Sequence, residues 1–533
     1  MTVPTAVGDQ TPDRTDIAAG SVADVLGFVA MCVGMFMAIL DVQVVATSLP
    51  AIQEALGIEP AAMTWVQTAY LVAEVIAIPL TGLLTRALTM RWLFVLAVSL
   101  FTGASIGCAT SSGLVPLIAW RTVQGFAGGT LIPSVFSAVF LLFPPKRQGV
   151  ATTLAGVLAV LAPTVGPVVG GWITQTWAWH WLFLINVAPG ILAAICAALL
   201  LPRHAIAPRR LLGIDLVALA LLASGLAALE IGLTQAPDRG WLSGPVLGLV
   251  CYSVASATAF VRRTLRAARP IIDLRLLGDR AFVMGCILSF VLGIGLFGTV
   301  YLMPVFLALV RGHNPLEIGK IMLVTGVAQL CTAPLAVLLD RRVDGRILTL
   351  FGFVLFGVGL GFSAYDGRSA DYDAMFWPQV IRGCAIMFCL LPPTRLALGH
   401  LAPARVPDAS GLFNLMRNLG GAVGLALIGS LVFGRAPAIG RGILERLAAG
   451  DAATARDLGI PLSALQNGGA GDLAPGLRAM LDQLVGRSAL ATAIGEAWAL
   501  VAALTLTAVA TLLFVGSSQS RQEAQVSDVR SES

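Results

Sequence analysis

Two acidic residues and one basic residue lie inside segments that are otherwise apolar. Asp41 lies in MFMAILDVQVVATSLP, Glu74 in AYLVAEVIAIPL and Arg121 in LIAWRTVQG. A charge near the centre of a bilayer costs about 2.5–3.5 kcal/mol on insertion scales, so such residues usually serve a function. Burial disfavours the ionised form of a carboxyl group, and a nearby guanidinium favours it. Moving the guanidinium, or binding a cationic substrate, would then load or release a proton.

The composition places these three residues in membrane-spanning helices. The chain has 533 residues, of which 57% are hydrophobic and 12% charged, whereas about 25% of the residues in soluble domains are charged. The long apolar runs do not alternate as barrel strands do. We therefore expect an all-α polytopic membrane protein. Fourteen spans are predicted, at 26–49, 62–84, 92–110, 114–139, 149–174, 182–201, 213–235, 244–261, 282–309, 318–339, 347–364, 375–398, 410–433 and 493–515.

The distribution of Lys and Arg predicts the orientation. With the N-terminus inside, the inward-facing segments carry twenty such residues and the short outward-facing loops carry three, Arg239, Arg311 and Arg368. Cytoplasmic loops carry the excess of positive charge, so both termini are expected in the cytoplasm. The long outward loop 434–490 is excluded because long segments do not follow this rule.

This topology places Asp41 and Arg121 at similar depth, roughly 12 Å and 10 Å from the outer ends of their helices. Glu74 lies close to the middle of its span. We predict that these three residues couple proton movement to transport. The alternative is that Asp41 and Arg121 form a fixed structural pair that braces two helices.

Other embedded charges have a simpler explanation. Glu230 and Arg417 lie close enough to predicted helix ends for their side chains to reach the interface. Arg382 in WPQVIRG is as deep as Arg121, and the sequence reveals no partner for it.

Two pairs of segments indicate an internal repeat. PLTGLLTRALTMR (79–91) and PLAVLLDRRVDGR (334–346) share six of thirteen residues, and PPKRQGVA (144–151) matches APARVPDA (402–409) at three positions. The offsets, 255 and 258, nearly agree. Two six-helix halves are the architecture of major-facilitator transporters, which bind substrate between the halves. The spans 213–235 and 244–261 are then an insertion between the halves.

The repeat divides the chain into five parts. We expect a cytoplasmic tail at 1–25, an N-terminal half at 26–201, the insertion and a linker at 202–281, a C-terminal half with the loop 434–490 at 282–515, and a second tail at 516–533.

The segment LAPTVGPVVGGWI (161–173) combines small residues with prolines. A G-x-x-x-G pattern lets another helix approach closely, and proline bends the helix that contains it. The residues concerned are Pro163, Gly166, Pro167, Gly170 and Gly171.

Several of these segments resemble one family. LDVQVVATSLP resembles the first-helix motif of the 14-helix drug:proton antiporters, LIAWRTVQG resembles their motif whose arginine is associated with proton transfer, and LAPTVGPVVGGWI resembles their antiporter motif. INVAPGI, PIIDLRLLGDRAF and WPQVIRG are similar to the EmrB/QacA branch, nearest to EmrB. The likeness runs from about residue 26 to 515. It implies a proton-coupled multidrug efflux transporter that exports hydrophobic small molecules across a bacterial inner membrane.

The loop between the second and third spans departs from the superfamily pattern G-x-L-a-D-R-x-G-R. GLLTRALTMR keeps Gly82 but has Arg86 at the Asp position and Thr89 at the second Gly position. The superfamily pattern assigns a gating ion pair to this loop, and the loss of the Asp puts that ion pair in question on the N-terminal side. The second copy keeps Asp340–Arg341. The resemblance therefore implies a cytoplasmic gate made by Gly82, Asp340 and Arg341.

Four polar residues of the first, second and fourth spans are expected to line a substrate cavity: Gln43, Thr47, Tyr70 and Gln124. Gln43 and Thr47 stand where relatives tend to have Thr and Asn, so the resemblance implies altered substrate contacts there. The spans 318–339 and 410–433 carry no mid-span carboxylate, unlike relatives that expel divalent cations. This favours monocationic, neutral or weakly acidic hydrophobic substrates.

The loop 434–490 contains a helix-capable stretch, GLRAMLDQLVGRSALATAIGEAW. By resemblance to EmrB relatives it would face the periplasm and meet an adaptor protein leading to an outer-membrane channel. A solvated, unstructured loop is the alternative.

Three other functions compete with multidrug efflux. A dedicated exporter of one metabolite, such as a siderophore or lipid, would have the same fold. A membrane enzyme is disfavoured because His180, His204, His313 and His400 lie in separate loops or helix ends. A transport-inactive sensor would not need Asp41 to titrate. We expect no cofactor, no metal and no nucleic-acid partner.

Overall fold

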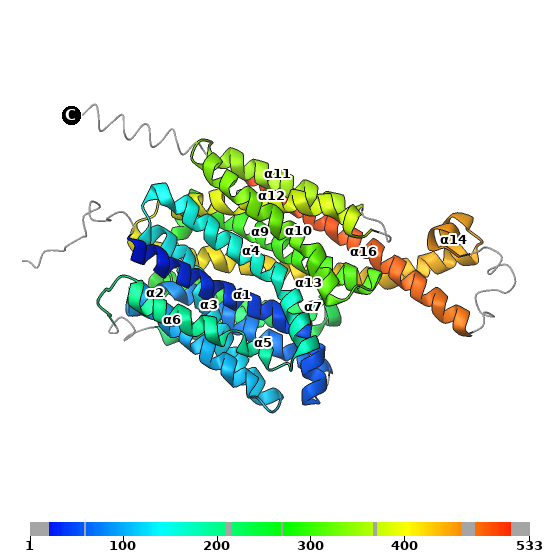
Figure 1. Cartoon of the computed structure of the whole chain (residues 1–533), viewed down its shortest axis with the longest axis horizontal. Coiled ribbons are helices and arrows are strands. Elements are labelled where there is room, and N and C mark those ends of the chain that lie inside the picture. The colour runs from blue at the N-terminus through cyan, green and yellow to red at the C-terminus, as the bar shows by residue number, and fades with distance from the viewer. Residues whose placement is uncertain are drawn as a thin grey trace, which may run out of the picture.

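The structure is a computed structural model that describes residues 21–57, 60–207, 215–267, 270–365, 370–460 and 475–512. All regular elements in these ranges are helices (Figure 1), which confirms the predicted all-α class. The tail 516–533 and most of the tail 1–25 lie outside the described residues.

The helices follow the predicted order. The N-terminal half contains α1 (Val22–Leu56), α2 (Pro60–Ala109), α3 (Leu114–Leu142), α4 (Pro145–Thr176), α5 (Trp181–Leu184) and α6 (Val187–Leu200). The insertion contains α7 (Leu216–Arg239) and α8 (Gly244–Arg266). The C-terminal half contains η2 (Leu274–Gly278), α9 (Arg280–Val305), η3 (Phe306–Arg311), α10 (Pro315–Asp340), α11 (Gly345–Ala364), α12 (Tyr372–Leu398), η4 (Pro403–Arg405), α13 (Val406–Ala448), α14 (Ala452–Leu458) and α16 (Pro475–Leu512).

The long helix α2 contains two membrane spans. Thirteen helices of the described part are long and apolar enough to cross a bilayer, and one of them covers the 45 residues Trp65–Ala109. A helix of that length would extend about 68 Å, more than twice the apolar thickness of a bilayer. The backbone leaves the helical region at Thr89 (φ 70°, ψ 156°), where the chain turns. Counting both arms of α2 gives the fourteen predicted spans.

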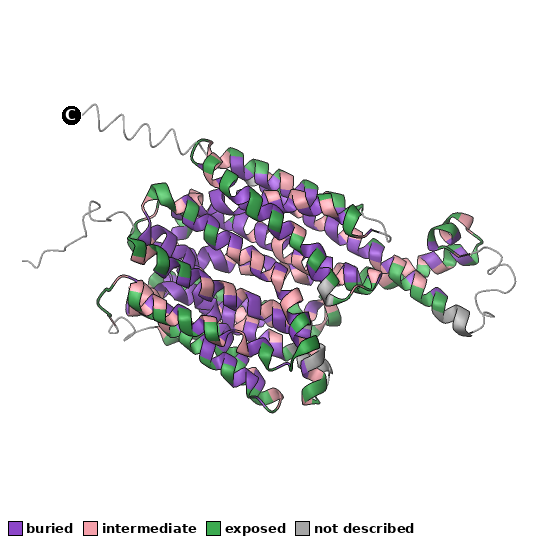
Figure 2. Cartoon of the chain, in the orientation of Figure 1, coloured by how far each residue is buried: buried purple, intermediate pink, exposed green. Residues whose placement is uncertain are grey.

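Burial follows the membrane setting. Figure 2 shows buried residues concentrated in the centre of the bundle, with exposed positions along its outside. Many of the exposed positions are large apolar side chains, including Leu96 on α2 and Leu192 and Leu199 on α6. Such side chains would be costly in water and suit contact with lipid.

The described residues of loop 434–490 form a helical hairpin. Here α13 and α16 extend beyond the bundle, and α14 lies between them in sequence (Figure 1). Their contact is apolar and centres on Ile443, Leu447, Leu458 and Leu481. Of the two alternatives that the sequence left open, the helix-capable stretch is helical in α16.

The end of the bundle opposite this hairpin is called the basic face. It is defined by Arg86, Arg91, Lys146, Arg341 and Arg395, which lie where α2 turns, where α4 begins, and at the ends of α10 and α12. This is the face that the Lys and Arg distribution predicts to be cytoplasmic.

The inserted helices α7 and α8 pack against each other, and α7 also packs against α2 and α13. At the start of α7, Arg263 of α8 lies 2.5 Å from the Asp215 carboxylate. This hydrogen bond holds the pKa of Asp215 below its usual range. Because α7 contacts one helix of each half, a side chain on α7 can reach the region between the halves.

The turn at Thr89 generates a test of backbone strain. Its φ and ψ are nearly restricted to glycine, and a β-branched residue there costs about 1–3 kcal/mol. Its buried hydroxyl also has no hydrogen-bond partner among the described residues. We expect Thr89→Gly to raise the free energy of unfolding by about 1–2 kcal/mol after the entropic cost of glycine. Thermal unfolding in detergent measures this. Thr89→Ala is the control, and equal stability of the two variants would contradict the strain.

Candidate substrate and proton site

Asp41 and Arg121 meet in the centre of the N-terminal half. Arg121 Nη1 lies 2.5 Å from Asp41 Oδ2, and both side chains are completely buried. Arg121 Nε also donates to the carbonyl oxygen of Val66 at 3.2 Å. The structure thus brings α1 and α3 together through the two charges that the sequence places at similar depth.

Three further polar residues surround this pair. Gln124 donates to Asp41 Oδ1 at 3.0 Å and to Ser105 Oγ at 2.8 Å, and it accepts from Arg121 at 2.8 Å. Asn186 donates to Asp41 Oδ1 at 2.7 Å. We call Asp41, Arg121, Gln124, Asn186 and Ser105 the aspartate cluster. Sequence reasoning missed Ser105 and Asn186, although Asn186 lies in the INVAPGI segment.

Two predicted cavity residues belong to the surroundings of this cluster instead. The Tyr70 ring lies against the Arg121 guanidinium, with 4.3 Å between the ring centroid and Arg121 Cζ. The Tyr70 hydroxyl donates to the carbonyl oxygen of Ala38. Gln124 is fully buried within the cluster. Neither residue is in the lining of the cavity described below, because hydrogen bonds and stacking hold both against Arg121. The side chain of Thr47 lies outside the described residues.

A cavity of about 150 Å³ lies between the halves. Its walls come from α1, α2, α3 and α4 on one side, from α9, α12 and α13 on the other, and from α7. Gln43 and Pro163 line it, as does Glu74. Drug-sized ligands usually occupy pockets of about 300–1,000 Å³. A substrate of that size therefore requires the halves to move apart.

The cavity contains charges of both signs. Glu74, Glu230 and Arg417 all line it, and each is more than nine-tenths buried. The Glu74 side chain is hydrogen-bonded to Asn418, and the charges of Glu230 and Arg121 both act on it. Glu74 is thus the one member of the predicted proton-coupling set in the lining of this cavity.

The burial of Glu230 and Arg417 corrects their assignment to the membrane interface. Helix α7 ends at Arg239 rather than at 235, and α13 begins at Val406 rather than at 410. Each charge is therefore about 14–16 Å from its helix end at 1.5 Å per residue, too far for the side chain to reach water easily. The sequence placed each of these helix ends four residues too close to the charge, and this made both charges look able to reach the interface.

The predicted antiporter motif packs α4 against α1. A methyl group at Gly166 would overlap the Cβ atom of Gln43, and Ser48 Oγ lies 3.5 Å from the carbonyl oxygen of Gly170. Pro167 and Gly171 continue the same buried stretch of α4. Small residues here therefore permit close contact between two helices that line the cavity.

Two contacts join the halves at the basic face. Arg86 of α2 forms an ion pair with Asp408 of α13, whose side chain lies directly against Gly82. In the other copy, Arg341 donates to the carbonyl oxygen of Lys146 at 3.0 Å. The first contact shows that this loop does form an ion pair despite Arg86 at the Asp position, because Asp408 supplies the acidic partner from the opposite half.

Asp340 has a different partner from Arg341. Its carboxylate forms an ion pair with Arg395 within the C-terminal half, and it lies beside Gly149 of α4. The predicted gate residues Gly82, Asp340 and Arg341 therefore all lie at contacts of the basic face.

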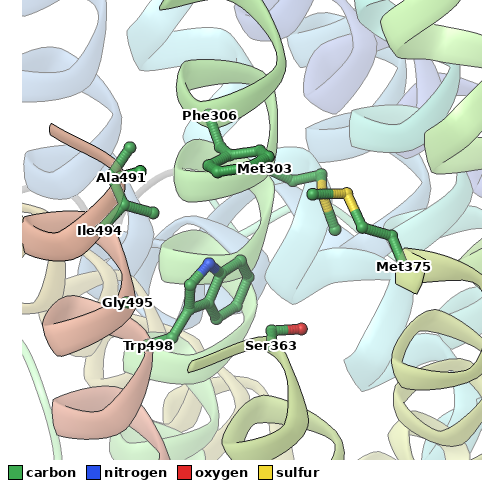
Figure 3. Close-up of a pocket in the computed structure, with 8 residues that line it drawn as sticks. All are labelled: Met303, Phe306, Ser363, Met375, Ala491, Ile494, Gly495 and Trp498. Carbon is green, nitrogen blue, oxygen red and sulfur yellow. The ribbon is translucent and has the colours of Figure 1, made fainter. Parts of the chain in front are cut away.

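Arg382 is completely buried and stacks on Trp498, with 4.7 Å between the guanidinium and the ring centroid. Figure 3 shows Trp498 beside Met303, Phe306 and Ser363 in a second cavity. That cavity is about 10 Å³, room for about one water molecule, and is too small for a substrate.

A helical bundle in two halves with a partly polar cavity between them is typical of membrane transporters. Residues 31–425 match the Major Facilitator Superfamily. The chain belongs to this superfamily and, by the relatives described next, to its EmrB-type branch.

Curated relatives support this assignment. The chain is 39% identical over 408 residues to the colistin resistance protein EmrB of Acinetobacter baumannii, covering 76% of this chain and 79% of that protein. It is 32% identical over 402 residues to the multidrug export protein EmrB of Escherichia coli K12, covering 75% and 78%. It is also 32% identical over 427 residues to a multidrug resistance protein B homolog of Mycobacterium tuberculosis, covering 79% and 77%.

Solved structures show the same fold. The human organic anion transporter MFSD10 superposes with a TM-score of 0.58 at 15% identity, covering 92% of this chain and 99% of that one. The proton:xylose symporter XylE gives a TM-score of 0.58 at 14% identity, covering 93% and 97%.

The aspartate cluster generates a test of its structural role. Asp41→Asn leaves Arg121 buried without a carboxylate, and breaking a buried ion pair in this way costs about 3–5 kcal/mol. We expect the double variant Asp41→Asn/Arg121→Gln to recover most of that loss. Thermal unfolding of the purified single and double variants measures it. A double variant no more stable than Asp41→Asn would contradict the pairing.

The Arg86–Asp408 contact predicts how firmly the halves are joined. Arg86→Ala leaves a buried carboxylate without its ion pair, and we expect about 5–30-fold faster hydrogen exchange in residues 402–411, equivalent to about 1–2 kcal/mol. Arg91→Ala is the matched control, since Arg91 bonds the carbonyl oxygen of Ala198 within its own half. Equal exchange in both variants would mean that Arg86 does not hold the halves together.

Proposed function

We propose that this chain is a proton-coupled multidrug efflux transporter that exports hydrophobic small molecules in exchange for protons. The observation that carries the proposal is the cavity between the halves, which combines apolar walls with the buried carboxyl groups of Glu74 and Glu230. Relatives named for multidrug export and colistin resistance support the same function.

Proton coupling is assigned to Glu74, Asp41 and Arg121. Glu74 faces the cavity, where substrate would enter, and the Arg121 charge acts on Glu74 as well as on Asp41. Arg121 contacts Asp41 directly and acts on Glu74 only through its charge. Protonation of Glu74 would change the charge next to the Asp41–Arg121 pair, and this would link the occupancy of the cavity to the aspartate cluster.

Alternating access is assigned to the contacts between the halves. Gly82, Asp340 and Arg341 would close the cavity at the basic face, where Arg86 and Arg341 cross from one half to the other. Gly166 and Gly170 would keep α4 against α1 while the halves move.

The proposed location is a bacterial inner membrane, with the basic face and both termini in the cytoplasm and the domain limits predicted above. The hairpin of α13, α14 and α16 then lies in the periplasm. We propose it as the contact for an adaptor protein and an outer-membrane channel, because its apolar centre gives it a fixed shape outside the bundle. A transporter is proposed rather than an enzyme because the chain belongs to the Major Facilitator Superfamily and its relatives are named for export.

Inverted membrane vesicles with an acidified lumen test this function. A fluorescent dye reports the pH gradient while hydrophobic cations, neutral drugs and non-uncoupling weak acids are added. We expect several compounds to release protons from vesicles with the wild-type chain. Glu74→Gln and Asp41→Asn should abolish the release, because neither variant can carry the proton at that position.

Two exposed carboxylates supply matched controls. Glu54→Gln and Asp373→Asn make the same chemical changes on exposed positions of α1 and α12 and should leave proton release unchanged. No release from abundant, folded wild type would overturn the proposal. A response to a single compound would instead favour the dedicated metabolite exporter.

A further inference from the structure

The charged groups of the cavity are incompletely paired by the protein. Within the described residues, Oε2 of Glu230 has no hydrogen-bond partner, and neither have Nε and Nη2 of Arg417. Glu230 is 5% exposed and Arg417 is 8% exposed, and both line the cavity. Buried charges without hydrogen-bond partners are energetically unfavourable. A ligand that supplies the missing partners would therefore bind with an advantage.

One part of the cavity suits a cation. Glu74 comes from α2 and Glu230 from α7, and the charge of Glu230 acts on the Glu74 carboxyl group. Two neighbouring carboxylates repel each other when both are ionised, and a cation between them relieves the repulsion. An ammonium group has three N–H donors, which is enough to serve both carboxylates.

Another part suits an anion. The Arg417 guanidinium lies 5.3 Å from the ring centroids of both Phe136 and Phe413. Aromatic contacts of this kind hold the plane of the guanidinium and leave its N–H groups to donate at the edge. A carboxylate accepts two such bonds in parallel, the strongest arrangement that arginine offers.

Apolar side chains, including Val42, Leu296 and Phe297, fill much of the remaining lining. We propose that this cavity binds apolar molecules that carry both an amine and an acidic group, with the amine at Glu74 and Glu230 and the acidic group at Arg417. Helix α7 thereby supplies half of the cation site, so the insertion forms part of the substrate site. This inference rests on the proposed function and narrows its substrate class beyond the monocationic, neutral or weakly acidic molecules that the sequence favours.

Binding to the purified full-length chain in detergent tests the proposal without a proton gradient. Isothermal titration would compare four probes built on naphthalene: one with an aminomethyl and a carboxymethyl group, one with the amine alone, one with the acid alone, and a neutral methyl ester. We expect the amphoteric probe to bind at least about tenfold more tightly than each of the others, since each charge-assisted hydrogen bond contributes about that factor.

Two substitutions assign the groups. Glu230→Gln should weaken binding of the amphoteric and amine probes about tenfold and leave binding of the acid probe unchanged. Arg417→Gln should weaken binding of the amphoteric and acid probes about tenfold and leave binding of the amine probe unchanged. Glu54→Gln and Arg239→Gln are matched controls at exposed positions, the second at the end of α7. If Glu230→Gln or Arg417→Gln fails to fold, Glu230→Asp and Arg417→Lys take their place. These two variants keep the charge and should retain part of the affinity.

The outcomes separate this inference from the proposed function. Equal affinity of the wild-type chain for all four probes overturns the inference, whatever the variants do. If vesicles release protons for many compounds while the probes bind equally, the amphoteric site fails and efflux stands. The opposite outcome has two parts: vesicles release no protons for any compound, yet the amphoteric probe binds most tightly and Glu230→Gln removes the contribution of its amine. In that case the amphoteric site stands and proton-coupled efflux fails.

Discussion

A charged side chain inside an apolar bundle needs a partner, and the centre of this molecule is arranged around that requirement. The effective cost of burying an ion is several kcal/mol even after relaxation. The aspartate cluster meets it within the protein, because Arg121, Gln124 and Asn186 all contact the Asp41 carboxylate. Around the cavity, atoms of both Glu230 and Arg417 have no hydrogen-bond partner among the described residues. In the aspartate cluster only Arg121 Nη2 lacks such a partner, so that cluster mainly braces helices, whereas the cavity leaves binding capacity of both charge signs for a ligand.

The same requirement joins the two halves at the basic face. Each of the repeated segments 79–91 and 334–346 contacts the second repeated segment of the opposite half: Arg86 pairs with Asp408, and Arg341 bonds Lys146. Both contacts lie on the same side of the cavity. Because the cavity is smaller than a drug-sized pocket in this state, substrate exchange requires these contacts to open on one side or helices such as α4 and α10 to separate.

The inserted helices contribute more than extra length. Helix α7 packs against α2 of one half and α13 of the other, and this position carries Glu230 to the cavity that the two halves enclose. A transporter of twelve helices would lack that wall. The chemistry of the site therefore depends on a helix that the internal repeat does not account for.

The sequence by itself determined the helical class, the fourteen spans and the common depth of Asp41 and Arg121, because hydropathy and the rise per residue act locally along the chain. Neither hydropathy nor spacing determines how a helix is rotated or which distant helix it meets. Only the tertiary structure therefore decided that Asn186 and Ser105 complete the aspartate cluster, that Tyr70 and Gln124 lie outside the cavity, and that Asp408 pairs with Arg86. It also decided where Glu230 and Arg417 lie: α7 and α13 each extend four residues farther than the sequence predicts, and both charges line the cavity rather than reach the interface.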